Sequence, residues 1–387
     1  MKVVLLADLP LDLEKINGGV QSAVLNLLYG FNYIDELWVD VIVFNSKIKT
    51  QKKIVFLDNI TIYFIPIKYP IIIIDYFLNR KALFTLIRRL NPDIIHIQAA
   101  APHLFRFAFV NKKNIVITQH GIMQKETRFV KTFTGRIKYF VKIFVEKFYY
   151  PRFKNLIFIS NYNLNLFKST HNMNKYNFDK IYNAVNIQFF ENEKKTKKIE
   201  KELVYVGVIN KRKNLEILLK TYTIPIIYNK YKFLNIIGGF LDIKYENKIK
   251  SFIENNNLSN KVRFWGWLTQ KQLLQFYKKK YIFVLPSLQE TLPVSIAEAL
   301  SKGQIVIARS VGGINEMIIN GFNGFLFNKD NELVKILENL DLSSNQILRI
   351  SENAVKTAKI NYNPLDVAKR TYKFYQNVLK DIEIDKI

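Results

Sequence analysis

Two glutamates have a spacing that could serve chemistry on a hydroxylated, phosphorylated ligand. Glu290 and Glu298, with seven residues between them, lie in the stretch SLQETLPVSIAEAL, residues 287–300. An apolar run precedes the stretch, so we expect Glu290 in a strand-to-helix loop and Glu298 in the second helical turn. Free amides at a helix N-terminus attract phosphate, and carboxylates accept hydrogen bonds from hydroxyl groups. Taken alone, Glu298 is better explained as part of a solvated helix face; its context in the sequence favours the functional interpretation.

The elements that must position these acids form a repeating pattern. Short β-branched runs alternate with amphipathic ones, which is typical of parallel sheets covered on both faces. The first set of predicted strands is 3–8, 39–44, 60–65, 93–98, 114–120 and 155–160, and the second is 203–208, 233–239, 262–267, 281–287 and 304–310. The sequence therefore predicts an α/β fold with two Rossmann-like, doubly wound domains facing each other across a cleft.

The predicted boundaries follow the composition. We expect an N-terminal, acceptor-side domain over 1–187, a charged linker over 188–202 and a donor domain over 203–364. The linker contains ENEKKTKKIEKE, a charge-dense stretch with one apolar residue. A last amphipathic segment, 365–387, is predicted to be a helix that can pack on either domain, including back on the N-terminal one.

The bulk composition narrows the classes of partner. The 387 residues include 58 Lys and Arg against 32 Asp and Glu, a formal net charge of +26. Such a charge attracts phosphorylated ligands, anionic lipid or nucleic acid. The basic residues are dispersed and no nucleic-acid module is visible, so we expect no nucleic-acid partner. The absence of cysteine excludes thiolate chemistry and disulfides. We also expect no signal peptide and no transmembrane segment.

A glycine-rich run after the two acids extends the pattern. RSVGGINEMIINGFNGFLF, residues 309–327, places Gly312 and Gly313 after a predicted strand and Gly321 and Gly324 in a turn. The combined run from Pro286 to Gly324 resembles the signature of glycosyltransferase family four, the retaining GT-B enzymes that use nucleotide sugars. Other motifs extend the resemblance over nearly the full chain.

The resemblance implies a role for individual residues. Glu290 would orient the donor sugar, Glu298 would accept from the ribose, and Lys213 would bind the diphosphate. His120, which ends a predicted strand, matches the histidine that faces the transferred sugar; a structural role is its alternative. The implied catalytic residues are Glu290, His120 and Lys213, and the implied donor-binding residues are Gly18, Gly19, Gly207, Arg212, Lys213, Thr291, Leu292, Pro293 and Glu298.

The sequence departs from the family pattern at several positions. Val208 occupies a position where the family usually has Arg, and we expect Arg212 to supply the missing charge. Thr291 stands where Gly is common, which could narrow the space beside the sugar and affect donor choice. The segment DIIHIQ, residues 93–98, has Gln98 where a second histidine is common. Without its neighbours, Lys213 would be read as part of a solvated basic turn.

The segment RIKYFVKIFVEKFYYPRFK, residues 136–154, combines basic and aromatic residues. Such a helix suits an anionic membrane surface. The alternative is a helix whose aromatics pack on the sheet with lysines in water.

Together these patterns predict a cytoplasmic glycosyltransferase, peripheral on the inner face of the plasma membrane. It would move a sugar from a nucleotide-diphosphate donor to a hydroxyl of a glycan or lipid-linked acceptor, in cell-surface polysaccharide or glycolipid synthesis. A nucleotide-sugar epimerase on the same fold and a catalytically silent membrane-peripheral partner protein are the alternatives. We expect no cofactor and no metal, because the sequence lacks Asp-x-Asp and its alternating acids Asp381, Glu383 and Asp385 lie far from every motif.

Overall fold

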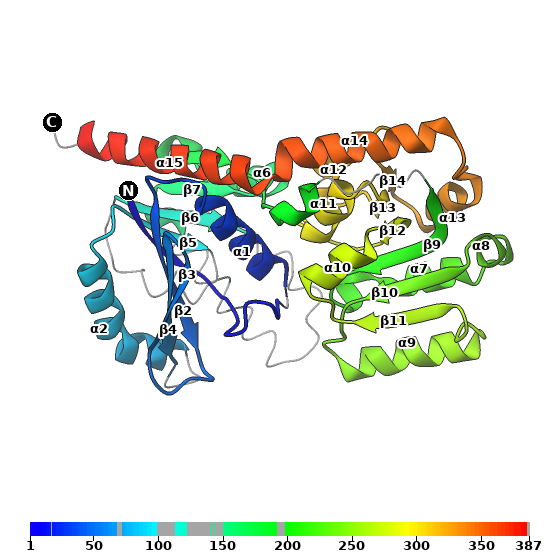
Figure 1. The fold of residues 1–387 in the computed structure, drawn as a ribbon, viewed down its shortest axis with the longest axis horizontal. Coiled ribbons are helices and arrows are strands. Elements are labelled where there is room, and N and C mark those ends of the chain that lie inside the picture. The colour runs from blue at the N-terminus through cyan, green and yellow to red at the C-terminus, as the bar shows by residue number, and fades with distance from the viewer. Residues whose placement is uncertain are drawn as a thin grey trace. The chain divides into compact units, whose positions relative to one another are not determined.

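The computed structural model divides the chain into two compact units (Figure 1). The residues that it describes are 1–16, 18–67, 72–98, 113–121, 140, 143, 150–191 and 198–384. Residues 1–184, apart from 17–19, and 364–387 form the first unit, and 185–363, with 17–19, form the second. Within the described part of the chain, no helix combines the length and apolar character that a bilayer span requires.

The first unit is built on an eight-stranded sheet with the order β3-β4-β2-β1-β5-β6-β7-β8. Adjacent strands of this sheet pair in parallel, except that β3 is antiparallel to β4. The strands are β1 (Lys2–Leu6), β2 (Trp38–Asn45), β3 (Lys52–Leu57), β4 (Ile60–Pro66), β5 (Ile94–Gln98), β6 (Ile115–Gln119), β7 (Asn155–Phe158) and β8 (Asn177–Lys180).

Two apolar cores cover the two faces of this sheet, because alternate side chains of a strand point to opposite faces. One core joins the sheet to α1 (Gly19–Phe31) and α15 (Pro364–Ile384). The other joins it to α2 (Ile72–Leu90) and α6 (Asn161–Lys168). The C-terminal helix α15 therefore belongs to the core of the N-terminal unit, where Phe374 and Tyr375 are buried.

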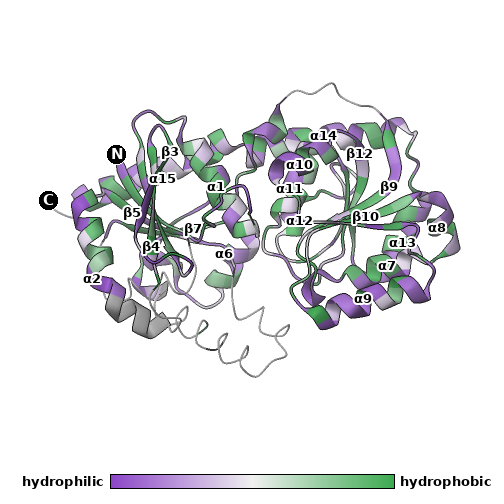
Figure 2. Ribbon diagram, turned by 60° about the horizontal axis from the view of Figure 1, so that its bottom comes forward, coloured by the Kyte–Doolittle hydropathy of each residue, from purple (hydrophilic) through white to green (hydrophobic). Residues whose placement is uncertain are grey.

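The second unit has a six-stranded parallel sheet with the order β11-β10-β9-β12-β13-β14. Figure 2 shows hydrophobic residues along its strands, whereas the helices around them carry both polar and apolar residues. The strands are β9 (Ile199–Val206), β10 (Phe233–Ile237), β11 (Val262–Gly266), β12 (Lys280–Leu285), β13 (Ile305–Arg309) and β14 (Phe325–Phe327). The helices are α7 (Leu215–Tyr222), α8 (Pro225–Lys230), α9 (Ile243–Asn255), α10 (Gln270–Phe276), α11 (Val294–Ser301), α12 (Ile314–Met317), α13 (Asp330–Asn339) and α14 (Asn345–Tyr362).

The predicted α/β fold is confirmed, and every predicted strand corresponds to an observed one. Three strands were not predicted: β3 at an exposed edge, and the short strands β8 and β14. Short 3-10 helices occupy Tyr150–Arg152, Met173–Lys175, Ile187–Phe190 and Lys211–Lys213.

The predicted linker is too long at its C-terminal end. β9 begins at Ile199, which is buried and pairs in register with Lys280 of β12, so 199–202 are strand. Ile199 is the one apolar residue of the charge-dense stretch and is followed by Glu200, Lys201 and Glu202, so the composition does not indicate a strand there. Residues 192–197 lie outside the described residues. Of the basic aromatic segment 136–154, the structure describes 140, 143 and 150–154, and the rest of the predicted membrane-binding segment lies outside the described residues.

Candidate active site

Two cations and one carboxylate form a buried cluster in the second unit. Lys213 Nζ lies 2.6 Å from Glu290 Oε1, and Arg212 Nη1 lies 3.3 Å from Glu290 Oε2. The Glu290 side chain is 6% exposed and that of Lys213 is 11% exposed. At such burial an unpaired charge would be costly, so each of these groups depends on the others. The predicted pair Lys213 and Arg212 is thus brought onto the predicted Glu290.

The turn after β9 positions Lys213 by local hydrogen bonding. The Asn210 side chain accepts a hydrogen bond from the Lys213 amide at 3.1 Å, capping the 3-10 helix Lys211–Lys213. Asn214 then adopts a left-handed conformation, which ends this turn and starts α7. Asparagine tolerates that conformation better than most residues, because its short polar side chain bonds locally.

Glycine is required where β9 and β10 end side by side. Gly238 has a φ of +132°, and a Cβ on it would lie 2.0 Å from the Gly207 carbonyl oxygen. Gly207 itself has a φ of +153°, and a Cβ there would lie 3.9 Å from Lys213 Nζ. The predicted donor-binding residue Gly207 therefore lies beside the lysine, where only glycine leaves the backbone bare.

The loop from β12 to α11 positions Glu290 through main-chain contacts. The Leu288 amide donates to the Arg212 carbonyl at 2.8 Å, and Arg212 Nη1 donates to the Gln289 carbonyl at the same distance. The Gly313 amide donates to the Glu290 carbonyl at 3.3 Å. The acid and the two cations are consequently fixed by one interlocked pair of loops.

The electrostatic state of Glu290 follows from these contacts. Burial raises the pKa of Glu290, but the charges of Lys213 and then Arg212 outweigh burial and hold the pKa below its usual value. Glu290 is therefore ionised at neutral pH. It can accept hydrogen bonds and stabilise positive charge, but it has no proton to donate as a general acid.

Glu298 lies in a different environment. It is 7% exposed on α11, and burial raises its pKa to about 8. Tyr277, whose own pKa is raised by burial and then by the Glu298 charge, is a neighbour of this carboxyl. The alternative of a solvated helix face is therefore wrong, because α11 is covered on nearly all sides and buries Ile296 and Ala299 as well. The carboxyl is mostly protonated at neutral pH.

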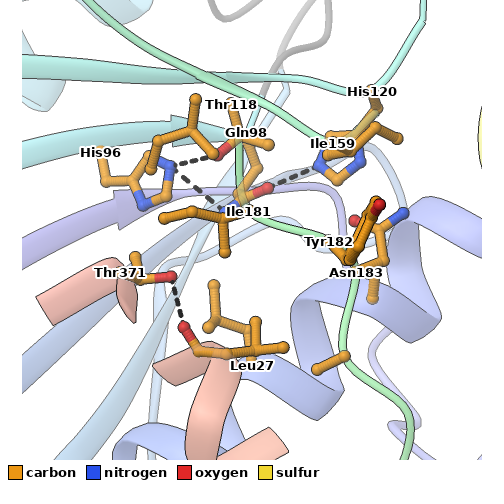
Figure 3. Close-up of a pocket in the computed structure, with 14 residues that line it drawn as sticks. Leu27, His96, Gln98, Thr118, His120, Ile159, Ile181, Tyr182, Asn183 and Thr371 are labelled. Atoms are coloured by element: carbon orange, nitrogen blue, oxygen red, sulfur yellow. Dashed lines mark hydrogen bonds between the residues drawn. The ribbon is translucent and has the colours of Figure 1, made fainter. Parts of the chain in front are cut away.

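The first unit holds a pocket lined by both polar and apolar side chains, which Figure 3 shows. Its cavity volume is about 20 Å³, and it is partly open to solvent. His96 and Gln98 of β5, Thr118 of β6 and His120 just after β6 line it with residues of α1, of the segment 181–184 and of α15. His120 Nε2 is 2.6 Å from Gln98 Oε1. Burial lowers the pKa of His120 to about 4, so its ring is neutral at physiological pH.

The remaining predicted residues lie at the ends of helices. Gly19 is the first residue of α1, and a Cβ on Gly18 would meet open space. Pro293 precedes α11 as its N-cap, and Leu292 is 6% exposed. Thr291 is partly buried in the same loop. The second unit thus gathers Gly207, Arg212, Lys213 and Glu290, whereas His120 belongs to the first unit.

Two family profiles match the chain. The profile described as Glycosyltransferase Family 4 matches residues 17–189, and the one described as Glycosyl transferases group 1 matches residues 186–357. The chain belongs to the family four, group 1 glycosyltransferases. The boundary between the two matches lies near the boundary between the two units, so each unit of this glycosyltransferase corresponds to one profile.

Curated relatives of this glycosyltransferase are distant. An uncharacterized 41.2 kDa protein in the cps region of Klebsiella pneumoniae is 27% identical over 64% of this chain and 68% of its own. An uncharacterized glycosyltransferase of Methanocaldococcus jannaschii is 30% identical over 46% of this chain and 48% of its own. An Escherichia coli UDP-Gal:alpha-D-GlcNAc-diphosphoundecaprenol alpha-1,3-galactosyltransferase is 28% identical over 38% of this chain and 34% of its own.

Solved structures show the same fold. A sucrose-phosphate synthase from Thermosynechococcus elongatus has a TM-score of 0.83 at 16% identity, covering 98% of this chain and 99% of that one. An Anabaena protein in complex with UDP-glucose has a TM-score of 0.70 at 16% identity, covering 97% and 100%. The glycosyltransferase therefore has the GT-B architecture.

Sequence reasoning missed three tyrosines that support these residues. Tyr205 is fully buried, donates to the Val208 carbonyl at 3.0 Å and lies near the Glu290 charge. Tyr277 lies beside Glu298, and Tyr375 of α15 reaches His96. Each looks like an ordinary core aromatic in the sequence. No spacing rule connects them to the motifs, because the contacts exist only in the folded chain.

Proposed function

We propose that this glycosyltransferase transfers a sugar from a nucleotide-diphosphate donor to a hydroxyl of a glycan or lipid-linked acceptor, with retention at the anomeric carbon. One observation carries the proposal: two cations are held beside an ionised, buried carboxylate in the unit that matches the group 1 profile. That arrangement suits a reaction in which a diphosphate leaves and a sugar gains positive character.

The leaving diphosphate is the group that needs cations. Lys213 and Arg212 stabilise the charge that builds on it, and because they are already held in place, they need little reorganisation during the reaction. Val208 occupies the usual arginine position without a charge, and Arg212, whose Nη1 lies within 3.3 Å of Glu290, provides the second cation. The contact of Arg212 with Glu290 supports the compensation that the sequence predicts.

The two glutamates divide the remaining work. Glu290 is ionised, accepts hydrogen bonds from sugar hydroxyls and stabilises positive charge at the anomeric carbon. Glu298 binds the ribose hydroxyls; as a mostly protonated acid it can donate one hydrogen bond and accept another. His120, neutral in the first unit, hydrogen-bonds a hydroxyl of the transferred sugar. Thr291, beside Glu290 in the chain, restricts which donor sugar fits.

We propose that no metal and no cofactor take part, since Lys213 and Arg212 supply the cationic charge that a divalent ion otherwise brings to a diphosphate. Activity that persists in excess EDTA would support this assignment. Loss of activity in EDTA, with recovery on adding Mg²⁺ or Mn²⁺, would overturn it.

The acceptor and pathway are proposed from the relatives. The Klebsiella relative is encoded in a cps region, and the name of the Escherichia coli relative specifies a diphosphoundecaprenol acceptor. A lipid-linked acceptor would place the enzyme on the cytoplasmic face of the membrane, in polysaccharide or glycolipid synthesis. Vesicle sedimentation with and without anionic lipid tests that location. Salt-insensitive binding, or none, would count against it.

The deciding experiment is a panel of nucleotide sugars scored by thermal shift and by slow donor hydrolysis. A bound donor raises the unfolding temperature by mass action. Nuclear magnetic resonance of the product formed on a diphosphoundecaprenol-linked sugar then gives the anomeric configuration. Inversion would refute retention. Conversion of the donor to its epimer without acceptor would indicate an epimerase, and the absence of any response would indicate a silent partner protein.

A further inference from the structure

A continuous chain of hydrogen bonds runs through the interior of the first unit to His120. Tyr375 Oη of α15 lies 2.5 Å from His96 Nδ1. On the other side of that ring, His96 Nε2 lies 2.7 Å from Thr118 Oγ1 and 3.3 Å from Gln98 Nε2. The Gln98 amide continues the chain to His120 (Figure 3).

The sheet register explains why these side chains meet. β5 and β6 are parallel neighbours in which Gln98 pairs with Thr118 and His96 with Val116. Residues two apart on a strand share a face, so His96, Gln98 and Thr118 all lie under α15. His96 is fully buried and Gln98 and Thr118 are at most 5% exposed, so the hydrogen bonds among them are largely shielded from water.

The chemistry of a glutamine amide gives this chain a direction. Gln98 Nε2 can only donate and Oε1 can only accept. With the amide oriented as in the structure, His96 Nε2 accepts and its Nδ1 therefore carries the proton that bonds Tyr375. On the other side, Gln98 Oε1 accepts from His120, which must carry its proton on Nε2. With these assignments, each contact in the chain pairs a donor with an acceptor.

The remaining ring nitrogen of the two histidines is His120 Nδ1. His120 Nδ1 is buried, and no donor among the described residues reaches it. In a neutral ring protonated at Nε2, Nδ1 is a bare acceptor. A ligand that forms a hydrogen bond with Nδ1 must therefore bring a donor, such as a hydroxyl group.

We propose that Gln98 is a positioning residue that fixes the tautomer of His120, so that His120 presents Nδ1 to the substrate as a hydrogen-bond acceptor. This rests on the proposed function for the identity of the substrate, a sugar hydroxyl. The tautomer itself is a property of the protein without substrate. α15 takes part through Tyr375, which holds the far end of the chain.

The first experiment reads the tautomer directly. The protein has four histidines, so nitrogen-15 labelling of histidine gives a small set of ring signals that single His variants assign. Nitrogen shifts separate protonated from bare ring nitrogens. We expect Nε2–H on His120 and Nδ1–H on His96 at pH 7.5. Nδ1–H on His120 would mean that the amide has the opposite orientation, and it would overturn the proposal.

Two substitutions of similar size give opposite expectations. Gln98→Glu keeps an acceptor for His120, so its proton stays on Nε2. Gln98→Leu removes the acceptor, so the His120 signals should move toward a mixture of tautomers. A Gln98→Leu protein that folds, as shown by an unchanged apolar methyl spectrum, and keeps wild-type His120 signals would refute the proposal. If Gln98→Leu does not fold, the Gln98→Glu and wild-type spectra still decide.

Activity provides the second readout. With donor and acceptor saturating, Gln98→Leu should lower kcat by about three- to ten-fold, the effect of one hydrogen bond, and leave the thermal shift by the free nucleotide diphosphate unchanged. Unchanged kcat despite a changed tautomer would refute the proposed hydrogen bond between His120 Nδ1 and the substrate. A wild-type protein without transferase activity would refute the proposed function instead, while the spectra would still settle the tautomer.

Discussion

The two units bury polar groups in opposite ways. In the second unit, Lys213 and Arg212 surround the ionised Glu290, a cluster that carries full charges in a mostly desolvated place. In the first unit, His96, Gln98, Thr118 and His120 form a chain of neutral groups. Burial lowers the pKa of His96 to about 3 and that of His120 to about 4, which keeps both rings uncharged. The charged cluster suits the handling of a diphosphate, and the neutral chain suits precise orientation of a hydroxyl.

This difference gives the stabilities of the two units opposite dependences on pH. The folded pKa values of His96 and His120 are depressed, so the stability they contribute is present above their unfolded value of 6.5 and is lost as pH falls toward 4. The folded pKa of Glu298 is raised, so its effect has the opposite sign. The first unit should therefore weaken in acid and the α11 region in base.

The largest expected effect concerns Lys213. Lys213→Ala removes the buried cation that neutralises the leaving diphosphate, and we expect kcat/KM to fall by about 100- to 1000-fold. Lys211→Ala is the matched control, since Lys211 lies in the same 3-10 turn but is exposed. Steady-state kinetics with a responsive donor measure both. Equal losses in the two variants would mean that general positive charge, and not the cluster, drives catalysis.

The second prediction uses the raised pKa of Glu298, about 8. Between its unfolded pKa of about 4.5 and about 8, the folded protein holds a proton that the unfolded chain has lost, so stability falls as pH rises by on the order of a few kcal/mol. Glu298→Gln cannot ionise and should remove this slope. Urea unfolding at pH 5, 6, 7 and 8 compares the variant with the wild type. If the free energies of unfolding of the variant and the wild type change in parallel with pH, Glu298 titrates normally.

The two glutamates and Lys213 also show how much of the site could be predicted from the sequence. Lys213 and Glu290 each lie in a short motif at the end of a strand, and parallel strands deliver such ends to one edge of a sheet. Their meeting was therefore predictable. The burial of Glu298 was not, because helix spacing alone places it off the apolar stripe, whereas in the fold α11 is covered on nearly all sides.

The neutral chain was harder still to predict. His96 and Tyr375 are 279 positions apart in the sequence and meet because α15 returns to the first unit. Sequence patterns assigned the helix but not the face or depth at which it packs. In the sequence, Gln98 is only a departure from the usual histidine. The role of its amide follows only when His96 and His120 are known to lie on either side of it.

A smaller effect is expected at Arg212. Its side chain is 26% exposed, so solvent screens its charge more than that of Lys213. Arg212→Ala should lower kcat/KM about ten-fold, and Arg212→Lys should recover part of the loss because it restores the charge without the second hydrogen bond to the Gln289 carbonyl. Kinetics of both variants provide the test. No loss in Arg212→Ala would mean that Val208 is not compensated by this arginine.

The smallest effect tests the neutral chain through stability alone. Tyr375→Phe keeps the ring in the core but removes the oxygen that His96 Nδ1–H bonds, leaving a buried donor unsatisfied. The expected loss is about 1–3 kcal/mol in the free energy of unfolding, measured in urea. Tyr372→Phe is the control on the same helix, because Tyr372 bonds Glu36 at the exposed surface, where water replaces the lost partner at a cost of about 0.5 kcal/mol or less. If the two variants lose equal stability, the hydroxyl of Tyr375 contributes no more than a surface contact. The neutral chain would then be held at Gln98 and Thr118, without the C-terminal helix.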